Sequence, residues 1–122
     1  MTKLTLVVGA SPHPYRYAHL AVQRLKSQGH PVIAFGKRPG KINDVPILTR
    51  AEEVGSPDLH TLTLYLGPDH QAQYAEWFIA LKPRRVIFNP GTENPELESR
   101  LSREGIEVIR ACTLVMLGMG SY

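Results

Sequence analysis

The stretch Leu4-Thr5-Leu6-Val7-Val8-Gly9-Ala10-Ser11-Pro12 decides the fold of this chain. Its first five residues form a short apolar run, which is typical of a strand buried on both faces of a sheet. The run stops at a glycine, and the residues up to Pro14 must then form a loop. Beyond the loop, a helical spacing of apolar residues is kept by Ala18, Ala21, Val22 and Leu25. A buried strand, a loop and a helix are the first part of a β-α-β unit.

The rest of the chain repeats this pattern. Further strands are expected at residues 31–35, 61–65, 85–88 and 106–109, with helices in most of the intervals. Residues 36–46 are rich in glycine and proline and are expected to form a loop, followed by a short helical turn near 50–54. The pattern predicts one α/β domain over residues 1–122, a Rossmann-like three-layer α/β/α sandwich. Its sheet is expected to hold about five parallel strands in the order 3-2-1-4-5.

The composition is that of one globular domain. The chain has 122 residues, of which 43% are hydrophobic and 20% charged, and this balance argues against disorder. No apolar run approaches the ~20 residues of a membrane span, and no signal peptide is recognised, so we expect a cytoplasmic protein without a membrane partner. A single cysteine and scattered histidines predict no metal site. A net charge of +3 is too small to indicate nucleic acid.

The loops after the strands carry the chemistry that the sequence offers. In open parallel sheets, ligands bind outside the carboxyl ends of the strands, which selects residues 9–14, 36–41, 65–69 and 89–93. In the first loop, Gly9 permits a tight turn, Ser11 offers a hydroxyl, and the amides of the next helix attract anions. The loop lacks the G-x-G-x-x-G fingerprint, so a plain strand-to-helix turn is the alternative.

The end of the second strand narrows the choice of ligand. An NAD-binding fold usually has an acidic residue here, to hold the ribose hydroxyls. This chain has Phe35-Gly36 instead, followed by the basic residues Lys37, Arg38 and Lys41. A basic loop suits a ligand with a phosphate on its ribose, such as NADP or coenzyme A (CoA). The alternative is that these charges are solvated and bind nothing.

Catalytic residues are hard to find in the sequence. Cys112 lies in an apolar setting, where cysteines are commonly inert, and no two carboxylates have a spacing that argues for acid–base chemistry. The loop at 89–93 is polar, and Asn89, Thr92 and Glu93 are candidates to line a site, although turn and capping roles would also explain its composition. We therefore predict no catalytic residue.

Three short motifs resemble a known family. Gly9-Ala10-Ser11-Pro12, Pro39-Gly40-Lys41 and Ala111-Cys112-Thr113 look like the small stand-alone CoA-binding proteins. These are similar to the N-terminal CoA-binding domain of the succinyl-CoA synthetase α subunit. The similarity extends from about Leu4 to Leu117. It implies a Rossmann-like fold that binds CoA.

The resemblance also implies roles for particular residues. The phosphates would lie against Gly9, Ala10, Ser11 and Pro12. The nucleotide would meet Lys41, with Lys37 and Arg38 nearby. The end of the third strand would pack on the ligand through Tyr65, Leu66 and Gly67.

We therefore expect a CoA- or acyl-CoA-binding protein without catalytic activity. Two alternatives stay open. One is an NADP-linked or acyl-CoA-processing enzyme, with Glu93 or His13 as its acid–base group. The other is a module that has lost its ligand and acts through a protein partner. The apolar segment 114–119 could pack on a second copy of the chain, so a homodimer is an additional expectation.

Overall fold

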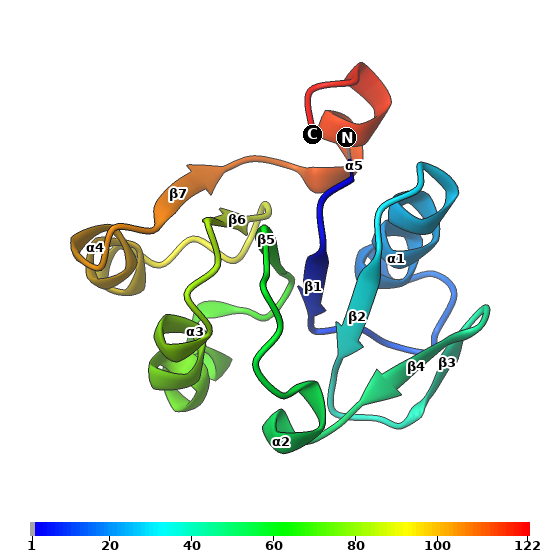
Figure 1. Cartoon of the computed structure of the whole chain (residues 1–122), viewed down its shortest axis with the longest axis horizontal. Helices are drawn as coiled ribbons and strands as arrows, with labels where there is room; N and C mark the ends of the chain where they lie inside the picture. Colours follow the sequence, from blue (N-terminus) through cyan, green and yellow to red (C-terminus); the bar gives the residue numbers. More distant parts are fainter. Residues whose placement is uncertain (1) are drawn as a thin grey trace.

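A seven-stranded sheet organises the molecule, and the computed structural model describes residues 2–122. The strands lie in the order β3-β4-β2-β1-β5-β6-β7 (Figure 1). Six of them run parallel, and only the edge strand β3 is antiparallel to its neighbour β4. Their bounds are β1 Thr5–Val8, β2 Val32–Phe35, β3 Gly40–Ile42, β4 Val45–Leu48, β5 Thr61–Leu64, β6 Arg85–Phe88 and β7 Glu107–Arg110.

The mostly parallel α/β sheet confirms the expected fold class, but the expected strand number and order are wrong. Residues 36–46 are not a continuous loop, because β3 and β4 form a hairpin there. Asn43 has φ 55° at the turn, a conformation that asparagine tolerates better than most residues. The strand β4 then pairs with β2, which leaves β5 to pair with β1. If the six parallel strands β1, β2, β4, β5, β6 and β7 are numbered 1 to 6 along the chain, their order in the sheet is 3-2-1-4-5-6.

Helices cover both faces of the sheet (Figure 1). Helices α1 (Tyr17–Ser27) and α5 (Thr113–Met119) lie together on one face, and α3 (Ala75–Leu81) and α4 (Pro95–Arg103) lie on the other. The expected turn near residue 50 is α2 (Ala51–Val54). Two 3₁₀ turns, η1 (Pro68–His70) and η2 (Ala72–Tyr74), precede α3.

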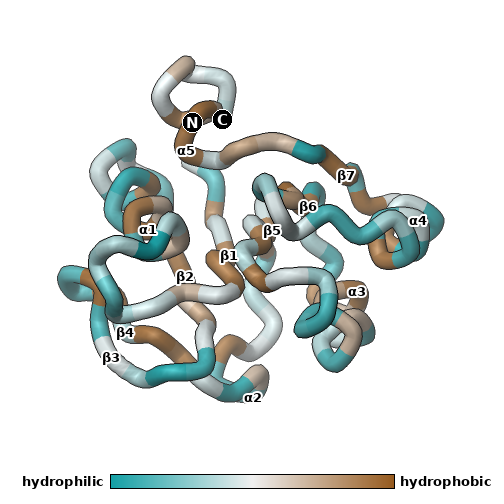
Figure 2. Tube along the Cα trace, turned by 180° about the vertical axis from the view of Figure 1, so that it is seen from behind, coloured by the Kyte–Doolittle hydropathy of each residue, from teal (hydrophilic) through white to brown (hydrophobic). Residues whose placement is uncertain are grey.

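The core consists of two clusters separated by the sheet. Strand side chains alternate between them, so that Leu6 and Val8 face α3 and α4, whereas Val7 faces α1. Figure 2 shows the apolar residues on the central strands and the hydrophilic ones mainly in the outer loops and helices. Every residue of β1, β5 and β6 is buried. Each helix within residues 2–122 is too short or too polar to cross a bilayer.

Candidate functional site

One cavity opens at the carboxyl ends of the central strands. It has a volume of about 470 Å³ and is formed by the loops that follow β1, β2, β5 and β6, together with the start of α1. This is the edge of the sheet where the sequence places the site. The lining includes Ser11, Tyr17, Arg38, Leu66 and Thr92, one residue from each of these segments.

The loop after β1 is fixed to the end of β2. The amides of Gly9 and Ala10 both donate to the Phe35 carbonyl, at 2.9 Å each. Gly9 has φ 95°, and a Cβ there would lie 3.1 Å from the Tyr65 carbonyl carbon. Glycine is therefore required at this position, by its backbone angle and by the close approach of the next loop. Because both amides are already paired, they are not free to hold a phosphate.

The start of α1 supplies the unpaired amides instead. Within residues 2–122, the N–H groups of Tyr17, Ala18 and His19 have no acceptor, as is usual for a first helical turn. No acidic residue occupies that turn, and the N-cap residue Arg16 provides no side-chain cap. The helix dipole adds partial positive charge at this end. The His19 ring donates to the Ser11 carbonyl at 2.9 Å, which holds the loop against the helix.

The charged side chains around the cavity are all basic. Its lining includes Arg16, Lys37, Arg38 and His70 and contains no aspartate or glutamate. Lys37 and Arg38 are exposed, so their charges need no partner within the protein. Basic side chains and free helix amides around one concave site are suited to a ligand with several negative charges.

Comparison with known proteins identifies the family. A family model described as a CoA-binding domain matches residues 3–118, nearly the whole chain. The chain belongs to this CoA-binding domain family. The resemblance expected from the sequence motifs is thereby confirmed.

Several solved structures have the same fold as this chain. The crystal structure of an uncharacterized protein is 45% identical to this CoA-binding domain, with a TM-score of 0.92, and the match covers 100% of this chain and 99% of that one. A Thermus thermophilus protein is 22% identical, with a TM-score of 0.86 and coverage of 99% and 91%. A conserved hypothetical protein from Pyrococcus furiosus is 24% identical, with a TM-score of 0.79 and coverage of 94% and 98%. The last two show likeness of fold alone. No curated protein matches the chain.

Most of the residues expected at the site line the cavity of the CoA-binding domain. They are Gly9, Ala10, Ser11, Lys37, Arg38, Tyr65, Leu66 and Gly67. The hydroxyl of Tyr65 is buried beside the side chains of Thr63 and Thr113, and it forms no hydrogen bond within residues 2–122. Burial raises the pKa of this phenol above the ordinary value for tyrosine, which is itself well above neutral pH.

Three other expected residues lie outside the lining. Lys41 is exposed on β3, opposite Pro46 of β4. Pro12 packs against the start of β3, where a Cβ on Gly40 would lie 3.1 Å from the proline ring. Asn89 is 2% exposed and has an internal role.

The hydrogen bonds of Asn89 explain that role. Its amide nitrogen donates to the Thr63 hydroxyl at 2.7 Å and to the Leu64 carbonyl at 2.9 Å, and its oxygen accepts from Thr113 N–H at 2.8 Å. The side chain therefore joins β5, β6 and the start of α5. Glu93 and His13, the acid–base candidates of the enzyme alternative, are also outside the lining.

Sequence reasoning missed part of the lining, namely Arg16, Tyr17, Ala18, His70 and Pro90. The first three lie where the first loop enters α1, and the expected free amides of that helix were the signal that could have found them. Pro90 belongs to the selected loop at 89–93, where the candidate Thr92 does line the cavity, and His70 lies one residue beyond the selected range 65–69.

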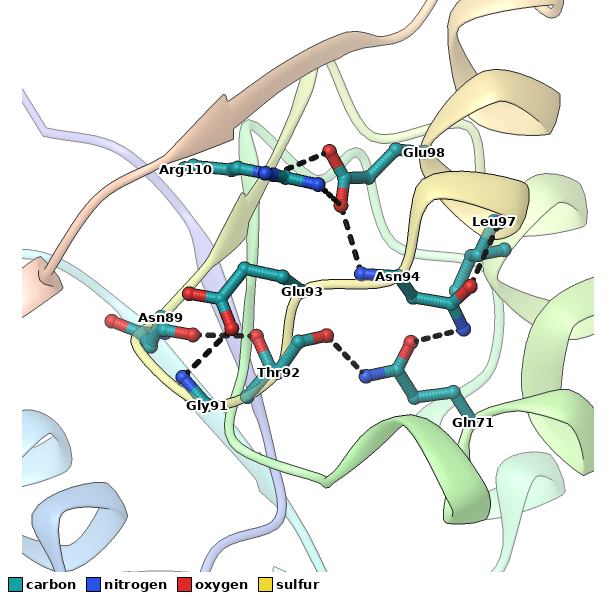
Figure 3. Close-up of polar contacts among 9 residues, drawn as sticks. All are labelled: Gln71, Asn89, Gly91, Thr92, Glu93, Asn94, Leu97, Glu98 and Arg110. Carbon is teal, nitrogen blue, oxygen red and sulfur yellow. Dashed lines mark hydrogen bonds and ion pairs between the residues drawn. The ribbon is translucent and has the colours of Figure 1, made fainter.

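A buried glutamine that the sequence did not reveal holds two of these loops together. Gln71 donates to the Thr92 carbonyl at 2.7 Å and accepts from the Asn94 amide at 3.0 Å (Figure 3). It also donates to the Leu66 carbonyl at 2.9 Å. Asn94 in turn caps α4 through Leu97 N–H, as its position before Pro95 predicts. This network fixes the distance between the two loop walls of the cavity. No group of histidine, cysteine or acidic residues within 2–122 could hold a metal ion.

Proposed function

We propose that this protein binds CoA or an acyl-CoA in the cavity at the carboxyl ends of β1, β2, β5 and β6, without catalysing a reaction of its own. The observation that carries the proposal is the charge of the cavity, which has the three cationic side chains of Arg16, Lys37 and Arg38 and no acidic one. Membership of the CoA-binding domain family supports the identity of the ligand. CoA brings a pyrophosphate and a ribose phosphate, and both require positive charge around them.

The free amides of α1 are the partners that we assign to the pyrophosphate. Tyr17 and Ala18 line the cavity and have unpaired N–H groups at the positive end of the helix dipole. Ser11 lies beside them, and its hydroxyl accepts from His13 N–H at 3.1 Å, which leaves the hydroxyl proton free to donate.

Lys37 and Arg38 are the partners that we assign to the ribose phosphate. Both follow β2 and line the cavity, where NAD-binding folds carry an acidic residue. The guanidinium of Arg38 can donate two parallel hydrogen bonds to a phosphate, and Lys37 adds a point charge. The adenine would lie between the loops after β2 and β5, against Leu66 and Gly67.

The lining also supports a binding role over a catalytic one. It contains no carboxylate, and its titratable groups are basic residues and tyrosines. The phenol of Tyr65 has a raised pKa and therefore cannot serve as a base near neutral pH. We assign it the role of a hydrogen-bond donor to the ligand.

The proposal is tested by calorimetric titration with CoA, acetyl-CoA, dephospho-CoA, NADP and ATP. We expect CoA and acetyl-CoA to bind best. The double variant Lys37→Ala/Arg38→Ala should bind CoA roughly ten- to a hundredfold more weakly, the effect of losing hydrogen bonds to a charged group. Lys41→Ala is the matched control, because it removes a nearby charge on β3 that lies outside the cavity lining, and it should change the affinity little.

Dephospho-CoA identifies the group that the basic pair contacts. It lacks the ribose phosphate, so its affinity for the native protein should be about as low as the affinity of CoA for the double variant. The double substitution should not lower the affinity for dephospho-CoA any further. A preference for NADP would favour the enzyme alternative. Absence of binding by every ligand at millimolar concentration would refute the proposal and favour a protein partner.

A further inference from the structure

Arg85 carries a positive charge inside the protein, at the end of the sheet opposite to the cavity. It is the first residue of β6 and is 8% exposed. Its Nε donates to the Thr61 hydroxyl at 2.7 Å, whereas its buried Nη2 has no acceptor among residues 2–122. The two ion pairs found among residues 2–122 join Arg100 to Glu76 and Arg110 to Glu98, so neither of them involves Arg85. The guanidinium is thus buried without a counterion from the described residues, a costly arrangement in a folded protein.

The groups around Arg85 are mainly basic. The backbone N–H of Lys3 donates to His30 Nδ1 at 3.0 Å, and His60 Nδ1 lies 2.7 Å from the same Thr61 hydroxyl that receives Arg85. Burial and then the charges of Arg85 and Lys3 lower the pKa of His60, with Glu107 as the acidic group that opposes them. Lys3, His30, His60 and Arg85 are called the basal cluster below. Arg85 and Lys3 supply the positive charge of this cluster, and the two histidines are neutral at neutral pH because their pKa values are lowered.

The ring of Tyr122 covers the basal cluster. It lies 4.6 Å from Arg85 Cζ and 5.9 Å from Lys3 Nζ, and its centroid is 5.0 Å from that of His30. Its hydroxyl pairs with Thr5 Oγ1 at 2.6 Å. A cation–π contact replaces only part of the hydration that a buried guanidinium loses. Because Tyr122 follows α5 and belongs to no strand, the ring can move away without breaking the sheet.

We propose that the basal cluster is a second binding site, for a small oxyanion of the phosphate or carboxylate class, and that Tyr122 is its movable cover. The planar donors of Arg85 match the oxygen atoms of such an anion, and an anion would supply the missing counterion. The ring leaves the guanidinium as the anion binds. This site goes beyond the proposed CoA-binding function, because it lies at the starts of the strands whose ends form the cavity.

Titration of the ¹⁵N-labelled protein with inorganic phosphate, followed by NMR, tests the proposal. We expect saturable shifts of the Lys3, Thr61 and Arg85 amides. Arg85→Met should weaken these shifts about tenfold or more, the effect of losing a charge-assisted hydrogen bond. Arg84→Met is the matched control, because it removes the neighbouring but exposed charge, and it should change the affinity less than threefold by the usual screening of exposed charges.

A second variant tests the cover without touching the buried charge. Tyr122→Ala should bind phosphate more tightly than the native protein, because no ring has to be displaced. An unchanged or weaker affinity would overturn the role of Tyr122, even if Arg85→Met failed to fold. Shifts confined to Lys37 and Arg38, or shifts that never saturate, would overturn the site itself. Neither result depends on whether CoA binds at the other end of the sheet.

Discussion

Gly36 shows how one residue shapes the candidate site. A Cβ at this position would lie 2.0 Å from the Ala10 carbonyl oxygen, which is backbone and cannot rotate away. The Ala10 loop is also held in place by two amides that donate to Phe35. The end of β2 therefore has no room for the acidic side chain that an NAD-binding fold would place there. The same contact brings the first loop beside Lys37, where both can line the cavity.

Replacement of Gly36 should strongly destabilise the folded protein. We expect Gly36→Ala to lower the free energy of unfolding by about 3 kcal/mol, at the upper end of the usual cost of overpacking, because the Ala10 loop has to move. Urea denaturation measures this change. Gly67→Ala is the control, since Gly67 has a negative φ and a Cβ at that position would have no atom within 4 Å, and it should stay within about 0.5 kcal/mol of the native protein. Equal effects of the two substitutions would contradict the steric argument.

At the scale of elements, Gln71 joins the loop after β5 to the loop after β6. Its side chain is fully buried, and its amide satisfies the carbonyls of Leu66 and Thr92, one from each loop. Thr92 itself donates from its hydroxyl to the Asn89 carbonyl at 2.7 Å, so the network continues to the end of β6. The two walls of the cavity are therefore held by side chains and not by backbone pairing.

Removal of this link should affect both stability and binding. Gln71→Leu keeps the side-chain volume but leaves two carbonyls without a donor, so we expect a loss of about 3 kcal/mol, from roughly 1–3 kcal/mol for each buried unsatisfied group. CoA affinity should fall as well, since Leu66 and Thr92 line the cavity. Gln73→Leu, the same change at an exposed position, is the control for both measurements. Native-like stability of Gln71→Leu would show that the loops hold their positions without this side chain.

The sequence predicted elements correctly where the signal came from adjacent residues. It failed where the structure depends on which strands pair with each other. The Asn94-Pro95 start of α4 was recognisable because capping depends on adjacent residues. The hairpin of β3 and β4 was missed because Pro39, Gly40 and Pro46 were interpreted as loop residues. The buried residues Ile42 and Val45 become informative only once the positive φ of Asn43 is known. The strand order was wrong for the same reason, since β4 takes the place beside β2 that β5 was expected to fill.

At the scale of the whole molecule, the order of strands and helices was a better guide to the position of the cavity than the basic residues of the sequence were. The cavity lies at the carboxyl ends of the parallel strands, as the fold class alone predicts. Lys41 lies outside the cavity lining, because the missed hairpin carries this lysine onto an edge strand. The basal cluster could not be predicted, because Lys3, His30 and Arg85 are far apart in the sequence and meet only where the strands begin. Basic side chains lie at both ends of the strands. Lys37 and Arg38 at the cavity are exposed, whereas Arg85 at the opposite end is buried.

The basal cluster makes stability depend on pH across the whole fold. Burial, then Lys3 and Arg85, lower the pKa of His30 from 6.5, and burial with the same charges lowers that of His60. The folded state therefore binds fewer protons than the unfolded state just below pH 6.5, and stability should fall as the pH drops from about 7.5 to about 5. His30→Gln/His60→Gln removes both titrations, and glutamine can still accept from Lys3 N–H, so its urea midpoint should change less over that range. A native midpoint that does not fall, or a variant whose midpoint falls as steeply, would mean that the histidines do not sense the buried charge.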